Sequence, residues 1–245
     1  MLFRSGLESL VQSRSLPSGM ATLLHHCMQA GLNILVCGGP GTRTFEWVAA
    51  LVAEAPEQDR QVVVRPGPEP DPLPGNTVVI HSGSLAPQDG LTGPQQAVRA
   101  ALSLQPDRLV VHEVTGAEAS EVVAAMGRGL AGAIASLRAG TADAGLARLT
   151  ALVGLAGDAP DAAARARHVA QSVELVLTVQ RFADGHVRVT QLAEATVSSA
   201  GTAQAVDLVT YQPHTGRWVP TGVAPSVLVQ MQRRGISVDA GLLGE

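Results

Sequence analysis

Short apolar runs alternate along the chain with longer segments in which apolar residues recur at helical spacing. Buried strands are predicted at residues 33–37, 62–64, 77–80, 108–111 and 133–137. Helices are predicted at residues 15–30, 45–55, 95–104, 118–126, 142–155 and 161–172, the first with Ser15 as its N-cap. Alternation of this kind favours an α/β fold with a mainly parallel sheet flanked by helices.

The C-terminal part has a different pattern, typical of antiparallel strands. Residues 175–181 and 187–193 flank an Asp-Gly turn at 184–185, which predicts a β-hairpin. A second hairpin is predicted around residues 213–216, and a last helix near residues 225–234. We therefore expect three parts, which are a linker with the first helix (1–31), an α/β core (32–195) and a C-terminal hairpin and helix appendage (196–245).

A proline-rich segment separates the second and third predicted elements of the sheet. Residues 65–76 read RPGPEPDPLPGN, with proline at every second position from Pro66 to Pro74. Proline has no backbone N–H to donate to a neighbouring strand. The segment is therefore predicted to be an extended surface loop.

The composition narrows the possible functions. With 245 residues, 46% of them hydrophobic and 16% charged, the chain is long enough for one sizeable domain and too apolar to be disordered. The net charge is -4 and the arginines are scattered singly, so we expect no nucleic-acid partner. No apolar run approaches the roughly 18 residues that span a bilayer, so we expect no direct membrane insertion. Cys27 and Cys37 lack metal-ligand spacing, which favours reduced, cytosolic surroundings.

A glycine-rich turn between a strand and a helix is the arrangement of a phosphate-binding loop. Residues 38–44 read GGPGTRT, whereas a working loop has the form G-x-x-x-x-G-K-[ST]. Counted from Gly38, Arg43 stands at the last glycine, Thr44 at the lysine and Phe45 at the Ser/Thr position. Thr44 therefore cannot supply the lysine charge, and Phe45 has no oxygen for Mg²⁺. All 17 basic residues are arginines, so no other segment can offer a lysine.

Two alternatives remain for this loop. Its small residues could serve only a tight turn between strand and helix, without any phosphate. These are Gly38, Gly39, Gly41 and Thr42. Shifting the alignment by one residue would instead place Arg43 and Thr44 at Lys-Thr, although a planar guanidinium is a poor substitute for a compact ammonium.

Four segments occur in the order and spacing found in the type II/IV secretion ATPases. They read NILVCGG, LSLQPDRLVVHEVTGAEASEVVAAM, LARLTALV and HVAQSVELVLTVQRFADGHVRV. With the tail TGRWVPTGVAPSVLVQMQRRGISVDAGLL, they make almost the whole chain similar to that family, above all to the CpaF-like motors of tight-adherence (Tad) pili. The resemblance implies a RecA-like P-loop NTPase core that works in a hexameric ring. It also implies a preceding N-terminal domain. Since the chain begins almost at the linker helix, we expect that domain either to be absent by nature or to lie outside this sequence.

The resemblance also indicates where the family's catalytic residues should lie, and most of them are replaced. Arg65 and Pro66 stand in the acidic box, which should supply a carboxylate for the attacking water. The arginines expected near the third strand are replaced by residues 80–83, which read IHSG. Glu113 remains as a Walker B remnant, and Arg138 replaces the histidine of the histidine box.

The remaining charged residues have more than one interpretation. Glu113 could be a structural residue that pairs with a nearby arginine, and His112 a satisfied histidine at the end of a strand. Arg43 and Arg138 could clamp a phosphate, or they could fill the vacated pocket by pairing with Glu113. An occupied pocket is the interpretation we prefer.

These replacements predict a pseudo-ATPase, a catalytically inactive structural or regulatory subunit of a type II/IV secretion or Tad-like pilus machine. We expect it in a ring with itself or an active paralogue, at the cytoplasmic face of the inner membrane, held by membrane platform proteins. No cofactor and no metal are expected. The alternative is a divergent but active ATPase that uses ATP and Mg²⁺ and is completed by another domain or subunit. A third interpretation is a nucleotide-binding switch without hydrolysis.

Overall fold

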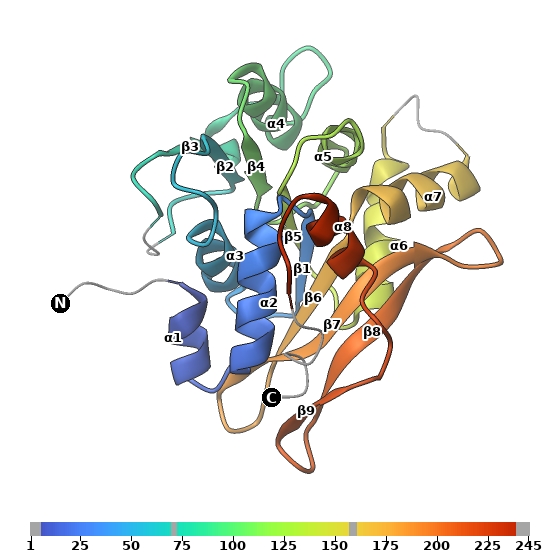
Figure 1. The fold of residues 1–245 in the computed structure, drawn as a ribbon. Helices are drawn as coiled ribbons and strands as arrows, with labels where there is room; N and C mark the ends of the chain where they lie inside the picture. The colour runs from blue at the N-terminus through green and yellow to red at the C-terminus, as the bar shows by residue number, and fades with distance from the viewer. Residues whose placement is uncertain (1–5, 70–72, 157–160, 239–245) are drawn as a thin grey trace.

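The computed structural model of the chain describes residues 6–69, 73–156 and 161–238. Within these residues one nine-stranded sheet has the order β3-β2-β4-β5-β1-β6-β7-β8-β9 (Figure 1). The first six strands in this order are parallel, and the last three continue the sheet antiparallel. Their bounds are β1 Ile34–Gly38, β2 Gln61–Arg65, β3 Thr77–His81, β4 Arg108–Val111, β5 Ile134–Leu137, β6 Leu175–Arg181, β7 Val187–Val197, β8 Ala203–Gln212 and β9 Arg217–Pro220.

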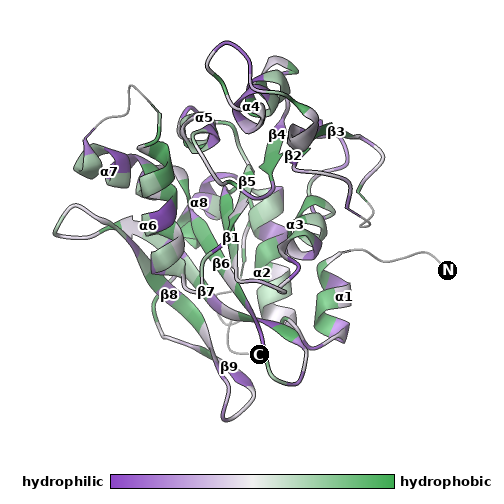
Figure 2. Cartoon of the chain, turned by 180° about the vertical axis from the view of Figure 1, so that it is seen from behind, coloured by the Kyte–Doolittle hydropathy of each residue, from purple (hydrophilic) through white to green (hydrophobic). Residues whose placement is uncertain are grey.

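Helices cover both faces of this sheet, because the side chains of its central strand are buried on both sides. In β1, Ile34 and Val36 join the core under α1, α2, α3 and α8, while Leu35 and Cys37 join the core under α4 to α7. Figure 2 shows hydrophobic residues concentrated on these central strands. The helices are α1 Leu7–Gln12, α2 Ser18–Gln29, α3 Thr44–Val52, α4 Gly93–Ser103, α5 Glu118–Gly127, α6 Ala142–Val153, α7 Ala162–Ser172 and α8 Val227–Arg233, with a short 3-10 turn at Ser82–Ser84.

The predicted α/β fold with its parallel sheet, both hairpins and the last helix are confirmed. The prediction of Ser15 as an N-cap is wrong, because α2 begins at Ser18 after Pro17, and no side chain caps it. Ser15 is instead buried, and its hydroxyl accepts a hydrogen bond from that of Ser13 at 3.0 Å. The boundary after residue 195 falls inside β7, and the division into three parts stays a prediction. Of the proline-rich loop, Pro70 and Pro72 lie outside the described residues.

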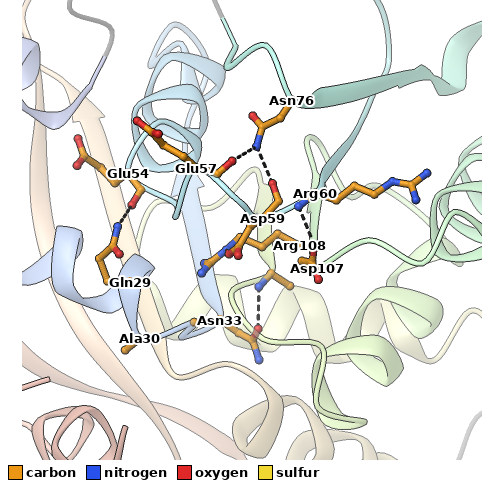
Figure 3. A network of polar contacts seen from close by, with 12 residues as sticks. Gln29, Ala30, Asn33, Glu54, Glu57, Asp59, Arg60, Asn76, Asp107 and Arg108 are labelled. Carbon is orange, nitrogen blue, oxygen red and sulfur yellow. Dashed lines mark hydrogen bonds and ion pairs between the residues drawn. The ribbon is translucent and has the colours of Figure 1, made fainter. Parts of the chain in front are cut away.

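Polar side chains join the elements at the amino ends of the parallel strands (Figure 3). The Asn33 side chain, placed just before β1, accepts a hydrogen bond from the Ala133 amide and donates one to the Ser172 carbonyl, both at 2.9 Å. Asn76, before β3, donates to the carbonyls of Glu57 and Asp59. The Asn33 contacts are buried and the Asn76 contacts are exposed, so the two asparagines should differ in how much they stabilise the fold.

We expect Asn33→Ala to lower the free energy of unfolding by about 2–4 kcal/mol, because it leaves one buried donor and one buried acceptor without partners. Asn76→Ala is the matched control, since it also removes two hydrogen bonds but leaves the carbonyls open to water. It should cost less than about 1 kcal/mol. Urea denaturation followed by circular dichroism measures both changes. Equal losses in the two variants would contradict the assignment of Asn33 as a buried link between strands.

Candidate functional site

A cavity of about 250 Å³ lies at the carboxyl ends of β1 and β4, where the phosphate-binding loop was predicted. Ligands of parallel α/β sheets bind at this edge, outside the carboxyl ends of the strands. The loop after β1 forms one wall and the residues after β4 and β5 form another. The lining residues are Gly38, Gly39, Pro40, Gly41, Thr42, Arg43, Thr44, Phe45, Glu46, Glu69, His112, Glu113 and Arg138.

Local packing accounts for two of the loop glycines. A Cβ atom on Gly38 would collide with the Thr42 hydroxyl and the Thr44 methyl group, so this position has no room for a side chain. Gly41 has a φ of +77°, a conformation that glycine adopts without strain. Gly39 has neither constraint, because nothing lies within 4 Å of a Cβ built there. The turn itself therefore explains Gly38 and Gly41 without a bound phosphate.

Arg43 occupies a backbone position that suits glycine. Its φ and ψ are 51° and 51°, in the left-handed region that costs a side-chain-bearing residue roughly 1–2 kcal/mol. In the alignment without a gap, Arg43 stands at the final glycine of G-x-x-x-x-G-K-[ST]. Because its backbone conformation is one that glycine adopts easily, the conformation favours this alignment over the one shifted by one residue. The side chain is 66% exposed and forms an ion pair with Glu46, one turn further along α3.

Phe45 fills the position at which the motif has a metal-binding hydroxyl. The residue is only 3% exposed, and its ring meets the His112 ring edge-on with 5.1 Å between the centroids. On the same ring, the Arg65 guanidinium carbon lies 5.0 Å from the centroid. Arg65 is 8% exposed, and its Nε and Nη1 atoms are buried without a hydrogen-bond partner among the described residues. The contact with the Phe45 ring stabilises this buried cation by about 0.5–2 kcal/mol.

His112 and Glu113 are held by neighbours on β5 and the residues after it. His112 Nδ1 lies 2.8 Å from Ser136 Oγ, which also accepts a hydrogen bond from the Glu113 amide at 3.0 Å. Burial lowers the pKa of His112 to about 4; Glu113 opposes this shift, while the charges of Arg65 and Arg138 add to it. His112 is therefore neutral at pH 7.

The predicted pairing of Glu113 with an arginine is half right. Arg138 Nη2 lies 3.1 Å from Glu113 Oε1. Arg43 pairs instead with Glu46, three residues further along the chain. The pocket that these residues line is not filled, because a cavity of about 250 Å³ remains there. With two arginines and three glutamates in its lining, the cavity has no excess of positive charge for a phosphate.

Two lining residues were missed from the sequence. Glu46 follows Arg43 by three residues at the start of a predicted helix, a spacing that could have indicated the ion pair. Glu69 lies in the proline-rich loop and reaches the cavity only through the fold, so no local pattern could have indicated it.

Pro66, the second residue at the predicted acidic box, does not line the cavity. Its carbonyl accepts a hydrogen bond from the Gly83 amide at 3.0 Å.

Other candidate chemistry is sparse among the described residues. No three of His, Cys, Asp and Glu gather there at a point that could hold a metal ion. Burial raises the pKa of the Cys37 thiol to about 12 and that of Cys27 further still, so neither is a nucleophile at neutral pH. None of the helices described is both long and apolar enough to cross a bilayer.

Comparison with known proteins gives consistent matches over most of the chain. A family model described as "Type II/IV secretion system protein" matches residues 4–232. Rv3659c of Mycobacterium tuberculosis, named for conjugal transfer, is 31% identical over 188 residues, which are 76% of this chain and 53% of that protein. The conjugal transfer protein TrbB of Rhizobium radiobacter is 24% identical over 182 residues, 73% of this chain and 53% of TrbB. The chain thus spans about half the length of these relatives.

The fold also matches a solved structure. The VirB11 ATPase of the Brucella suis type IV secretion system, crystallised with sulphate, has a TM-score of 0.63 and 22% sequence identity. The match covers 78% of this chain and 55% of VirB11. At this identity the likeness concerns the fold alone.

The low pKa of His112 should make the unfolding free energy depend on pH. Its pKa falls from 6.5 when unfolded to about 4 when folded, so the neutral form stabilises the fold at pH values above 6.5. That contribution should be lost as the pH falls from 6.5 towards 4, by at most about 1.4 kcal/mol per pH unit. We expect the difference in unfolding free energy between the wild type and His112→Gln to shrink over this range and to stay constant above it. Urea denaturation at several pH values tests this, and a constant difference throughout would contradict it.

Proposed function

The chain belongs to the type II/IV secretion system protein family, and on that premise we propose that it serves a secretion machine without hydrolysing ATP. It acts as a structural or regulatory subunit of a type II/IV secretion machine, or of the Tad-like pilus machine whose motors its sequence resembles. The observation that carries this proposal is the buried Phe45 ring at the position of the metal-binding hydroxyl.

The residues present do not fit a magnesium-bound triphosphate. Such a ligand needs a lysine on its β- and γ-phosphates and a hydroxyl on the metal. Thr44 and Phe45 stand at these two positions, and the chain has no lysine. A phenyl ring has no oxygen to give to a metal ion, and the Phe45 ring packs against Arg65 and His112 instead.

The electrostatics of the cavity support the same proposal. Its two arginines are paired with glutamates of the cavity itself, and Glu69 adds a further carboxylate. Two like charges 4 Å apart repel by about 4 kcal/mol near a protein surface. A triphosphate entering without a metal would meet that repulsion from three glutamates, with no unpaired arginine among the described lining residues to offset it.

A subunit without turnover acts through its contacts. The proposed assembly is a ring with further copies or with an active paralogue, docked on inner-membrane platform proteins at the cytoplasmic face. Family membership and the conjugal-transfer names of the relatives support this setting. No nucleic-acid contact is proposed, since the arginines form no stripe along the sequence.

One observation favours the rival function, a divergent but active ATPase. Glu69 and Glu113 both line the cavity, so carboxylates that could orient a water are present. In that case another domain or a neighbouring subunit would have to bring the missing positive charges. The Glu113→Gln variant separates the two functions in cells, because only an active enzyme should lose function when this carboxylate is removed.

The direct test is ATP binding and turnover with Mg²⁺, measured on the purified protein and on its assembled complex. We expect no binding at micromolar nucleotide and no turnover above the rate of a blank. Micromolar binding or hydrolysis by the wild-type protein alone would contradict the proposal. Turnover that appears only in the complex must be tested again with the partner's own catalytic residues inactivated.

A gain of binding should follow from restoring the motif. We expect the triple variant Arg43→Gly, Thr44→Lys, Phe45→Thr to bind ATP in a Mg²⁺-dependent manner, because it restores the lysine charge and the metal-binding hydroxyl. Arg43→Gly alone is the matched control, since it relieves the left-handed backbone but supplies neither group. Isothermal titration calorimetry measures both. Wild-type binding as tight as that of the triple variant would show that the native loop is competent.

A further inference from the structure

A second cleft, of about 390 Å³, opens between the β8–β9 hairpin and the turn that joins α1 to α2. It shares no lining residue with the phosphate-loop cavity. Within the described residues its lining is Val11, Arg14, Leu16, Pro17, Ser18, Arg188, Tyr211, Gly216 and Trp218. A volume of this size is within the usual range for ligand-binding clefts.

Aromatic rings gather at this cleft although the chain has few of them. The whole sequence contains three phenylalanines, two tryptophans and one tyrosine. Tyr211 lies between two other rings, with its centroid 5.3 Å from that of Phe182 and 5.0 Å from that of Trp218. All three residues are half-buried, and Trp218 Nε1 donates a hydrogen bond to the Val189 carbonyl at 2.8 Å. The rings are therefore fixed in place before any ligand arrives.

The charged groups that face the cleft are of one sign. The Arg188 guanidinium carbon lies 5.4 Å from the Phe182 centroid and 5.9 Å from that of Tyr211, and Asp184 outside the lining pairs with it at 2.7 Å. Arg14 is exposed at the rim, has a left-handed φ of 55°, and forms no ion pair with a described residue. Among the residues that the structure describes, no aspartate or glutamate lines the cleft, in a chain whose net charge is -4.

We propose that this cleft binds an acidic peptide segment of a partner protein. An apolar side chain of the peptide lies against Tyr211 and Trp218, and its carboxylates face Arg14. Tyrosine, tryptophan and arginine are the residues most enriched at the centres of protein interfaces, and rigid rings lose little entropy on binding. This inference rests on the proposed subunit role, because a subunit that does not hydrolyse ATP must act by binding partners.

The experiment measures fluorescence anisotropy with a dye-labelled synthetic peptide in which glutamate and aspartate alternate with leucine and proline. The same peptide with lysine at every acidic position is the control ligand. We expect saturable binding of the acidic peptide, weakening as salt screens the charges, and no binding of the lysine peptide. Arg14→Glu should weaken binding by about tenfold or more.

Arg217→Glu is the matched control variant, because Arg217 is an exposed arginine of β9 outside the cleft lining. It should change the affinity by no more than about twofold. Arg14→Gly removes the charge and suits the left-handed backbone, so it should weaken binding while the chain stays folded.

Three results would overturn the proposal. They are no saturation up to about 1 mM acidic peptide, equal losses in Arg14→Glu and Arg217→Glu, or a wild-type dimer that Arg14→Glu converts to a monomer in analytical ultracentrifugation. The last result would make the cleft an interface between copies of this chain. ATP turnover is measured on the same samples so that the two proposals can fail separately. Absent turnover without peptide binding overturns only the peptide-binding cleft. Turnover together with peptide binding overturns only the proposal of a subunit without ATP hydrolysis.

Discussion

The contact of the Phe45 ring with Arg65 and His112 constrains the whole carboxyl edge of the parallel sheet. It joins the start of α3 to the ends of β2 and β4, so three segments distant in sequence meet at one buried ring. Arg65 gains stabilisation from it, because its guanidinium is buried and no described residue hydrogen-bonds to Nε or Nη1. In a nucleotide-binding loop the same place would hold a metal ion and its phosphate oxygens. Here the Phe45 ring stands at the position of the metal-binding hydroxyl, with the Arg65 guanidinium against it.

The amino and carboxyl ends of the parallel strands are held together by different kinds of contact. At the amino edge, hydrogen bonds from Asn33 connect β1 to the segment before β5 and to the end of α7. At the carboxyl edge, the segments are joined by aromatic contacts and by the Arg138–Glu113 ion pair. The antiparallel strands beyond β6 extend the sheet away from the phosphate loop and carry the half-buried rings of the second cleft. The chain thus keeps the family's scaffold, and the cleft proposed to bind a peptide shares no lining residue with the phosphate-loop cavity.

Much of the fold follows from the sequence because the parallel strands are short apolar runs bounded by glycine, proline or polar residues. The helix α1 was missed because it has only six residues and its N-cap Gly6 gives no side-chain hydrogen bond. Sequence position alone placed Arg43, Thr44 and Phe45 at the loop. It could not show Phe45 against Arg65, since that contact exists only once β2 and β4 are paired. The assumed pairing of Arg43 with Glu113 was wrong because the local Glu46 competes for the same guanidinium.

The most direct measurement is a crystal structure of the protein grown with Mg²⁺ and a non-hydrolysable ATP analogue in large excess. We expect no phosphate or metal density at residues 38–45, with the Phe45 ring still packed between Arg65 and His112. Phosphates bound by the loop amides, with Mg²⁺ beside them and the Phe45 ring displaced, would contradict it. In that case the loop would bind nucleotide despite the replaced motif residues.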